Sequence, residues 1–214
     1  MTTATSADYK VGLTWRSLAA GLMAVSAGVF SQGVNAQLRV DISGVGATQY
    51  PIAIADFANS PSAQSISEVS RADLSRSGQF QIVSAAGANL DVNSDINFES
   101  WRNKGADYLA YGSVEQSGGQ YTVQYRLVDN VSQAELDGIA FTGSEKELRR
   151  MSHQIADRIY EKITGVRGVF STRLAYVLQT GNGYELPVAD ADGQNPQVML
   201  RSKQSIISPA WSPD

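Results

Sequence analysis

The sequence predicts an α/β domain with a mixed sheet and two or three helices, followed by a run of short antiparallel strands. Three observations predict this fold class. Apolar residues alternate with polar ones over several short segments before residue 142, and they recur at helical spacing in segments between those. Beyond Arg173, short apolar segments are separated by turn residues at intervals of about eight to twelve positions, which is typical of an antiparallel sheet.

The composition supports a packed core and excludes several classes of function. The chain has 214 residues, of which 43% are hydrophobic and 18% are charged, with a net charge of −4. That apolar content and length suit one or two domains. The charge is mildly acidic and has no polybasic stretch, so we expect no nucleic-acid partner. The absence of cysteine excludes disulfides, thiolate metal sites and cysteine nucleophiles.

Residues 1–36 have the pattern of a secretory signal peptide. Lys10 and Arg16 precede an uncharged apolar run over 17–30, and Ala36 provides a small residue at the expected cleavage site before Gln37. The run is short for a membrane-spanning helix. An uncleaved amphipathic anchor is the alternative. A secreted chain without cysteine suits the bacterial periplasm, and we expect no membrane insertion after cleavage.

The α/β domain is expected over 37–168. Strands are predicted at 38–42, 51–57, 80–83, 107–114, 121–128 and 134–141. A helix is expected to begin at a Ser60 cap followed by Pro61, to bury Ile66, Val69, Ala72 and Leu74, and to end at Gly78. A second, short helix is expected over 98–103, ending at Gly105.

The strands at 107–114 and 121–128 flank Ser117-Gly118-Gly119, which predicts a hairpin. In the second of these strands, one face is expected to carry the apolar residues Tyr121, Val123, Tyr125 and Leu127.

The last helix of the domain has clear start and stop signals. Ser144 and Glu147 have the spacing of a capping box, and Gly165 marks the end. The expected buried face is Leu148, Met151, Ile155, Ile159 and Ile163.

Residues 169–214 are expected to form the start of a β-propeller. Strands are predicted at 174–178, 184–189 and 197–200, and residues 205–207 lead into the final Ser-Pro-Asp. Four such strands in about forty residues fit one propeller blade.

For the residues that could support catalysis or metal binding, the sequence alone favours structural roles. His153 is the only histidine, and no catalytic or metal-binding partner for it is evident in the sequence. A structural position within the last helix, at the boundary of its buried face, is therefore favoured. The Asp190–Gly193 segment has the carboxylate spacing of a calcium loop but lacks the terminal Glu, which favours an Asp-Gly turn. Gly44-Val45-Gly46 is interpreted as a flexible turn. No Gly-x-Ser-x-Gly elbow occurs, and we expect neither a cofactor nor enzyme activity.

The segment directly after the predicted cleavage site is the candidate for binding a partner. Its alternation predicts a strand that is either docked in its own sheet or free to pair with the sheet edge of a partner. The candidate residues are Gln37, Leu38, Arg39, Val40, Asp41, Ile42 and Ser43.

A series of motifs resembles the TolB family. The motifs, in chain order, are Val34-Asn-Ala36, Leu38 to Val45, Pro51 to Phe57, Gly105 to Gly112, Ile163 to Phe170, Thr172 to Val177, Asp190 to Gly193 and Ser208 to Asp214. They extend over essentially the whole chain after residue 36.

The resemblance implies an N-terminal α/β domain, a six-bladed β-propeller and a function without catalysis. It implies a periplasmic scaffold of the Tol–Pal system that links inner-membrane TolA with the outer-membrane lipoprotein Pal. It assigns TolA binding to the segment matching Gln37–Gly44 and Pal binding to the propeller. Since one blade at most is present, the chain is expected to stop within the first repeat.

Two other classes of protein are kept as alternatives. One is a fragment of a peptidase in which a propeller precedes the hydrolase domain, and a downstream Gly-x-Ser-x-Gly motif would identify it. The other is a periplasmic receptor that binds a small ligand in the α/β domain, and tight solute binding would identify it.

Overall fold

The computed structural model describes residues 49–60 and 62–212. The predicted strand at 38–42, the predicted signal peptide, Gly44–Gly46 and Pro61 all lie outside the described residues. The elements in chain order are β1 (Tyr50–Ile54), β2 (Asp56–Phe57), α2 (Ser62–Arg76), β3 (Phe80–Val83), β4 (Asn89–Leu90), α3 (Phe98–Asn103), β5 (Tyr108–Ser117), β6 (Gln120–Asp129), β7 (Ala134–Gly143), the 3-10 turn η1 (Glu145–Glu147), α4 (Leu148–Thr164), β8 (Arg173–Ala175), β9 (Leu178–Thr180), β10 (Gly183–Asp190) and β11 (Gln197–Ser202).

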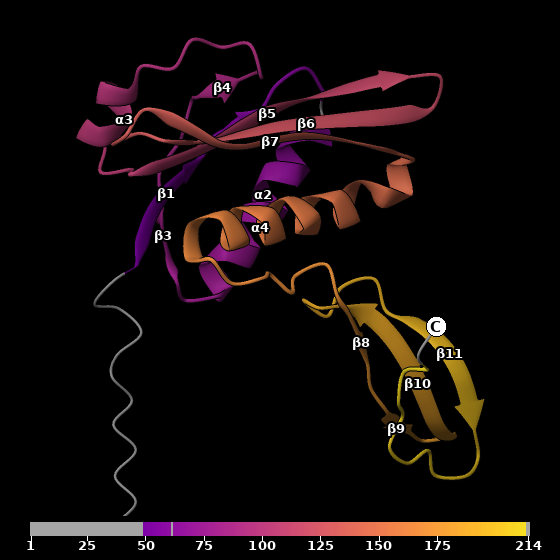
Figure 1. Ribbon diagram of the computed structural model, residues 1–214. Coiled ribbons are helices and arrows are strands. Elements are labelled where there is room, and N and C mark those ends of the chain that lie inside the picture. The colour runs from indigo at the N-terminus through magenta and orange to yellow at the C-terminus, as the bar shows by residue number, and fades with distance from the viewer. Residues whose placement is uncertain (1–48, 61, 213–214) are drawn as a thin grey trace, which may run out of the picture. The chain divides into compact units, whose positions relative to one another are not determined.

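The main sheet has five strands in the order β3-β1-β5-β6-β7 (Figure 1). Strand β1 pairs in parallel with both β3 and β5, while β5, β6 and β7 form an antiparallel meander. Helix α2 provides the crossover that the parallel pairing of β1 and β3 requires. The prediction of a mixed sheet is therefore confirmed, with three α-helices among the described residues.

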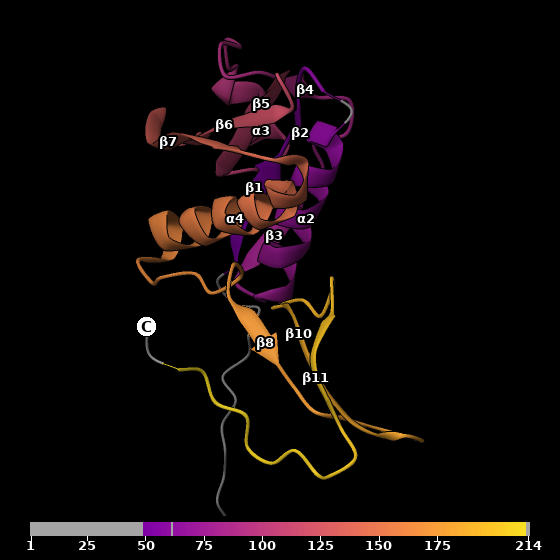
Figure 2. The same cartoon turned by 90° about the vertical axis from the view of Figure 1, so that its right-hand side faces the viewer.

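Helices cover both faces of this sheet, because β1 is apolar on both sides. Ile52 and Ile54 belong to the core that α2 and α4 complete, whereas Ala53 and Ala55 belong to a second core. That second core includes Trp101 of α3. Figures 1 and 2 show α2 and α4 side by side on one face and α3 on the opposite face. The small alanines allow close packing on the side of the shorter helix.

The hairpin and the alternation of β6 are as predicted. Strands β5 and β6 pair over their full lengths and are joined at Gly118 and Gly119, whose φ angles of 58° and 81° favour glycine. The predicted apolar face of β6 is buried, whereas Thr122, Gln124 and Arg126 are partly exposed. This face packs against the helices.

The predicted boundaries of helix α4 are confirmed, with one change at its start. The Glu147 carboxylate accepts hydrogen bonds from the N–H and the hydroxyl of Ser144, which is the predicted capping box. The first turn, η1, is a 3-10 turn rather than α-helix. Gly165 ends the helix in the left-handed conformation with φ 75°. Of the predicted face, all but the half-buried Ile163 are buried.

The buried face of α2 differs from the prediction. Ser60 accepts a hydrogen bond from the N–H of Ser62, as expected for a cap. However, Val69 is half-buried and Ala72 is exposed, so their predicted burial is wrong. The inward positions instead include Ser67, Ser70 and Asp73, which follow Ile66 more closely at 3.6-residue spacing. Small polar residues therefore occupy the side of α2 that meets α4.

The second sheet has β10 at its centre, paired with β11 on one side and with both β8 and β9 on the other. The predicted strand at 174–178 is interrupted at Tyr176 and Val177, so β8 and β9 act as one bent strand. The expected fourth strand is wrong, because residues 205–212 form no strand. Ser208 has a positive φ of 50° immediately before Pro209, which breaks an extended run there.

Candidate functional site

The predicted partner-binding residues, Gln37 to Ser43, lie outside the described residues. The described chain begins at Gln49, whose side-chain amide donates to the carbonyl of Gly78 at 3.0 Å. It then enters β1, which already has neighbours on both sides. The edges left open among the described strands of this sheet are those of β3 and β7.

The structure corrects the interpretation of His153 as a boundary residue without a partner. Its side chain is 2% exposed, and its Nδ1 lies 2.5 Å from Oδ2 of Asp73, which is itself 1% exposed. Asp73 lies on α2 and His153 on α4. The two helices approach closely because small residues face each other, and the Ser70 hydroxyl donates to the carbonyl of Ser152 at 3.0 Å.

Among the described residues, no hydroxyl is hydrogen-bonded to the free ring nitrogen of the buried Asp–His pair, as the nucleophile of a catalytic triad would be. Besides Ser67, whose hydroxyl donates to the carbonyl of Ala63, the buried serines of these two helices are Ser70 and Ser152. Both hydroxyl protons are donated to backbone carbonyls, that of Ser70 to Ser152 and that of Ser152 to Leu148. This arrangement favours a structural or ligand-binding role for His153 over nucleophilic catalysis.

The turn from Asp190 to Gly193 brings two more carboxylates to this place. The N–H of Gly193 donates to the carbonyl of Asp190 at 2.8 Å, and Gly193 has a φ of 81°, so the predicted Asp-Gly turn is confirmed. Asp192 is only 5% exposed and pairs with Arg149 of α4. Arg149 Nε lies 3.4 Å from Asp190, and Arg76 of α2 lies 3.8 Å from Asp192.

The surroundings of Asp192 favour its charged form. Burial opposes ionisation, but the hydrogen bond from the Gln194 N–H and the charge of Arg149 together lower the pKa of Asp192 below its ordinary value. Asp192 therefore presents a carboxylate to the imidazole at neutral pH.

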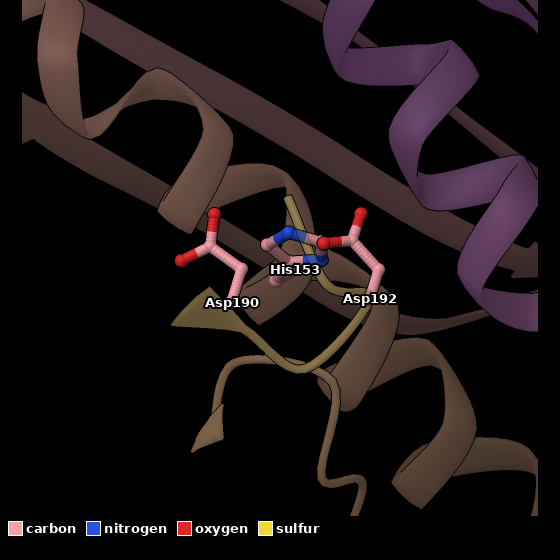
Figure 3. Close-up of side chains that lie close together, drawn as sticks. All are labelled: His153, Asp190 and Asp192. Atoms are coloured by element: carbon pink, nitrogen blue, oxygen red, sulfur yellow. The ribbon is translucent and has the colours of Figure 1, made fainter. Parts of the chain in front are cut away.

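A ring nitrogen of His153 and one carboxylate oxygen from each of Asp190 and Asp192 lie within 4.8 Å of one another. Figure 3 shows the imidazole between the two carboxylates. Because Nδ1 faces Asp73, Nε2 is the nitrogen that remains, and it is buried without a hydrogen-bond partner. We call His153, Asp190 and Asp192 the junction cluster.

Asp157 of α4 holds the segment that leads from the helix to β8. Its carboxylate accepts hydrogen bonds from the N–H of Phe170 at 2.6 Å, from the N–H of Ser171 at 3.0 Å and from the Ser171 hydroxyl at 2.5 Å. Gly168 passes so close that an added Cβ would overlap the Cα of Asp157. The contact between Asp157 and Gly168 could not be predicted from the sequence, because no local pattern links a helix residue to a glycine in the segment after the helix.

A pocket of about 530 Å³ lies next to the junction cluster. Asp190 belongs to both features, and Arg149, which also lines the pocket, pairs with Asp190 and Asp192. Its basic lining residues are Lys146, Arg149, Arg150 and Arg173.

No helix among residues 49–60 and 62–212 is both long and apolar enough to cross a membrane.

Two family models match the chain. The TolB amino-terminal domain matches residues 38–136, and the TolB beta propeller domain matches residues 160–214. The first match contains the main sheet through part of β7, and the second contains the β8–β11 sheet.

Curated relatives and a solved structure agree with these matches. The chain is 65% identical over 185 residues to the Tol-Pal system protein TolB of Bordetella avium, covering 86% of this chain and 42% of the relative. It is 61% identical over 202 residues to that of Bordetella pertussis, covering 93% and 46%. The crystal structure of TolB from Acinetobacter baumannii matches with a TM-score of 0.68 and 33% identity, covering 77% of this chain and 41% of that one. The chain thus spans less than half the length of these relatives.

Proposed function

Because the chain belongs to the TolB family, we propose that it acts as a periplasmic scaffold of the Tol–Pal system. In this proposal it links inner-membrane TolA with outer-membrane Pal without catalysing a reaction. The link would maintain outer-membrane integrity and support its invagination during division. The observation that carries the proposal is that relatives at 60–65% identity are named Tol-Pal system protein TolB.

The proposed domain boundaries follow the change of sheet. The main sheet and its helices end with α4 at Thr164, and the second sheet begins with β8 at Arg173. We therefore place an α/β domain at 37–168 and the start of the propeller at 169–214. Gly168 and Asp157 support a boundary there because they fix the path of the connecting segment.

TolA binding is assigned in this proposal to residues 37–43. In the alternating pattern of this segment, Leu38, Val40 and Ile42 form one face. A strand added to the edge of a TolA sheet would gain affinity from main-chain hydrogen bonds and specificity from that face. Pal binding is assigned to the propeller.

The experiment is a calorimetric titration of purified TolA into the exported chain and into a variant lacking residues 37–44. The proposal predicts that the deletion abolishes binding, while the circular dichroism spectrum and melting temperature remain those of the parent. The matched pair is L38S/V40S/I42S against R39A/D41A/S43A. We expect the first set to weaken binding far more than the second. Undiminished TolA binding by a folded deletion variant would overturn the assignment.

A further inference from the structure

We propose that the junction cluster of His153, Asp190 and Asp192 binds a divalent transition-metal ion of the Zn²⁺ class. The starting observation is His153 Nε2, a polar atom of a side chain that is 2% exposed and that has no hydrogen-bond partner. Buried polar atoms in folded proteins are nearly always satisfied, and leaving one unsatisfied is costly. A ligand at this nitrogen therefore explains a feature that the protein contacts leave open.

Asp73 prepares the imidazole to act as a metal ligand. The carboxylate of Asp73 lies 2.5 Å from Nδ1, so the ring donates its Nδ1 proton there and carries its lone pair on Nε2. Metal-binding histidines usually donate their other N–H to a carboxylate or a carbonyl in this way, which fixes the tautomer and the ring orientation. Asp73 is 1% exposed, and its other carboxylate oxygen accepts a hydrogen bond from Arg76.

The donor set selects the class of metal. One imidazole nitrogen and two carboxylate oxygens are ligands that Zn²⁺ accepts at about 2.0–2.2 Å, with three protein ligands leaving a position for water. Mg²⁺ and Ca²⁺ prefer sites made only of oxygen. The three donor atoms lie within 4.8 Å of one another, so they must draw closer by about an ångström to share one ion.

The carboxylates of the site already pair with neighbouring arginines. Asp73, Asp190 and Asp192 contribute three carboxylates, against which stand the guanidinium groups of Arg149 and Arg76. Each carboxylate has two oxygens, so Arg149 can stay on one oxygen while a metal takes the other.

A bound ion would connect three segments that are distant in sequence. Asp73 is on α2, His153 is on α4, and Asp190 ends β10 while Asp192 lies in the turn that follows. A metal that binds the folded chain and not the unfolded chain raises the melting temperature by mass action.

The test uses the whole exported chain without a polyhistidine tag, freed of metal with a chelator and titrated with Zn²⁺ in a calorimeter. We expect one ion per chain, an affinity lowered about tenfold or more by His153→Gln and Asp192→Asn, and a smaller loss in Asp73→Asn. Glu161→Gln, an exposed carboxylate on the same helix, is the matched control and should bind as the parent does. Binding that His153→Gln and Asp192→Asn leave unchanged would refute the site.

A measurement on the unaltered chain keeps the test independent of whether these variants fold. In ¹⁵N NMR of the imidazole, adding Zn²⁺ should shift the Nε2 resonance and leave Nδ1 protonated. A Nε2 that carries a proton and stays unchanged through the titration would show that a proton, donated to Asp192, occupies the place assigned to the metal.

Discussion

At the scale of single residues, the largest departures from expectation are ionisable side chains that pair across long stretches of sequence. His153 and Asp73 are 80 positions apart, and each looks like an ordinary helix residue until α2 and α4 pack together. The same holds for Asp137 on β7, whose carboxylate receives two hydrogen bonds at 2.7 Å from Arg158 of α4. The buried Tyr125 hydroxyl also donates to Asp137. Sequence periodicity carries no information about such pairs, because it describes one element at a time.

Asp137 should make the stability of the domain depend on acid pH. Burial alone would raise the pKa of Asp137, but hydrogen bonds from Arg158 and Tyr125 lower it below its ordinary value of 3.8. The unfolded chain then binds a proton more readily than the folded chain, so this contribution is complete above about pH 4 and is lost as the pH falls through the lowered value. The free energy of unfolding from urea titrations should therefore fall less steeply below pH 4 in Asp137→Asn.

The control for this prediction is Glu115→Gln, which removes an exposed carboxylate on β5. It should show the same acid dependence as the parent. If Asp137→Asn and the parent lose stability in parallel between pH 4 and pH 2, Asp137 is not the group responsible.

At the scale of elements, most of what could be predicted depended on local patterns. The capping box, the Gly165 stop and the buried face of α4 are all within one helix, and the β5–β6 hairpin is fixed by its two glycines. The prediction was wrong where tertiary contacts override periodicity. Ala72 is exposed because the side of α2 that contacts α4 carries Ser70 and Asp73. The predicted strand at 174–178 is divided, and β10 pairs separately with its two parts, β8 and β9.

The segment between α4 and β8 should tolerate no side chain at Gly168. A Cβ there would overlap the backbone of Asp157 and displace the carboxylate that holds Phe170 and Ser171. We expect Gly168→Ala to lower the free energy of unfolding by about 1–3 kcal/mol. Gly181→Ala is the matched control, because nothing lies within 4 Å of its added Cβ. Equal stability of the two variants in urea titrations would contradict the proposed constraint.

At the scale of the whole molecule, the sequence could predict the succession of a mixed α/β domain and propeller-like strands. It could not predict the strand order, in which β1 lies between β3 and β5. Nor could it predict that the turn after β10 reaches Arg149 and the neighbourhood of His153. These contacts join segments that no local pattern connects.

The most direct test of the proposed TolA link is a proline scan of Arg39, Val40, Asp41 and Ile42, with the affinity for TolA measured by calorimetry. Proline removes one amide donor, and in a strand added to a sheet edge only every second N–H points to the partner. The proposal predicts strong loss at two alternate positions and near-normal affinity at the two between them. Equal losses at all four positions, or no loss at any of them, would contradict binding of this segment as an added strand.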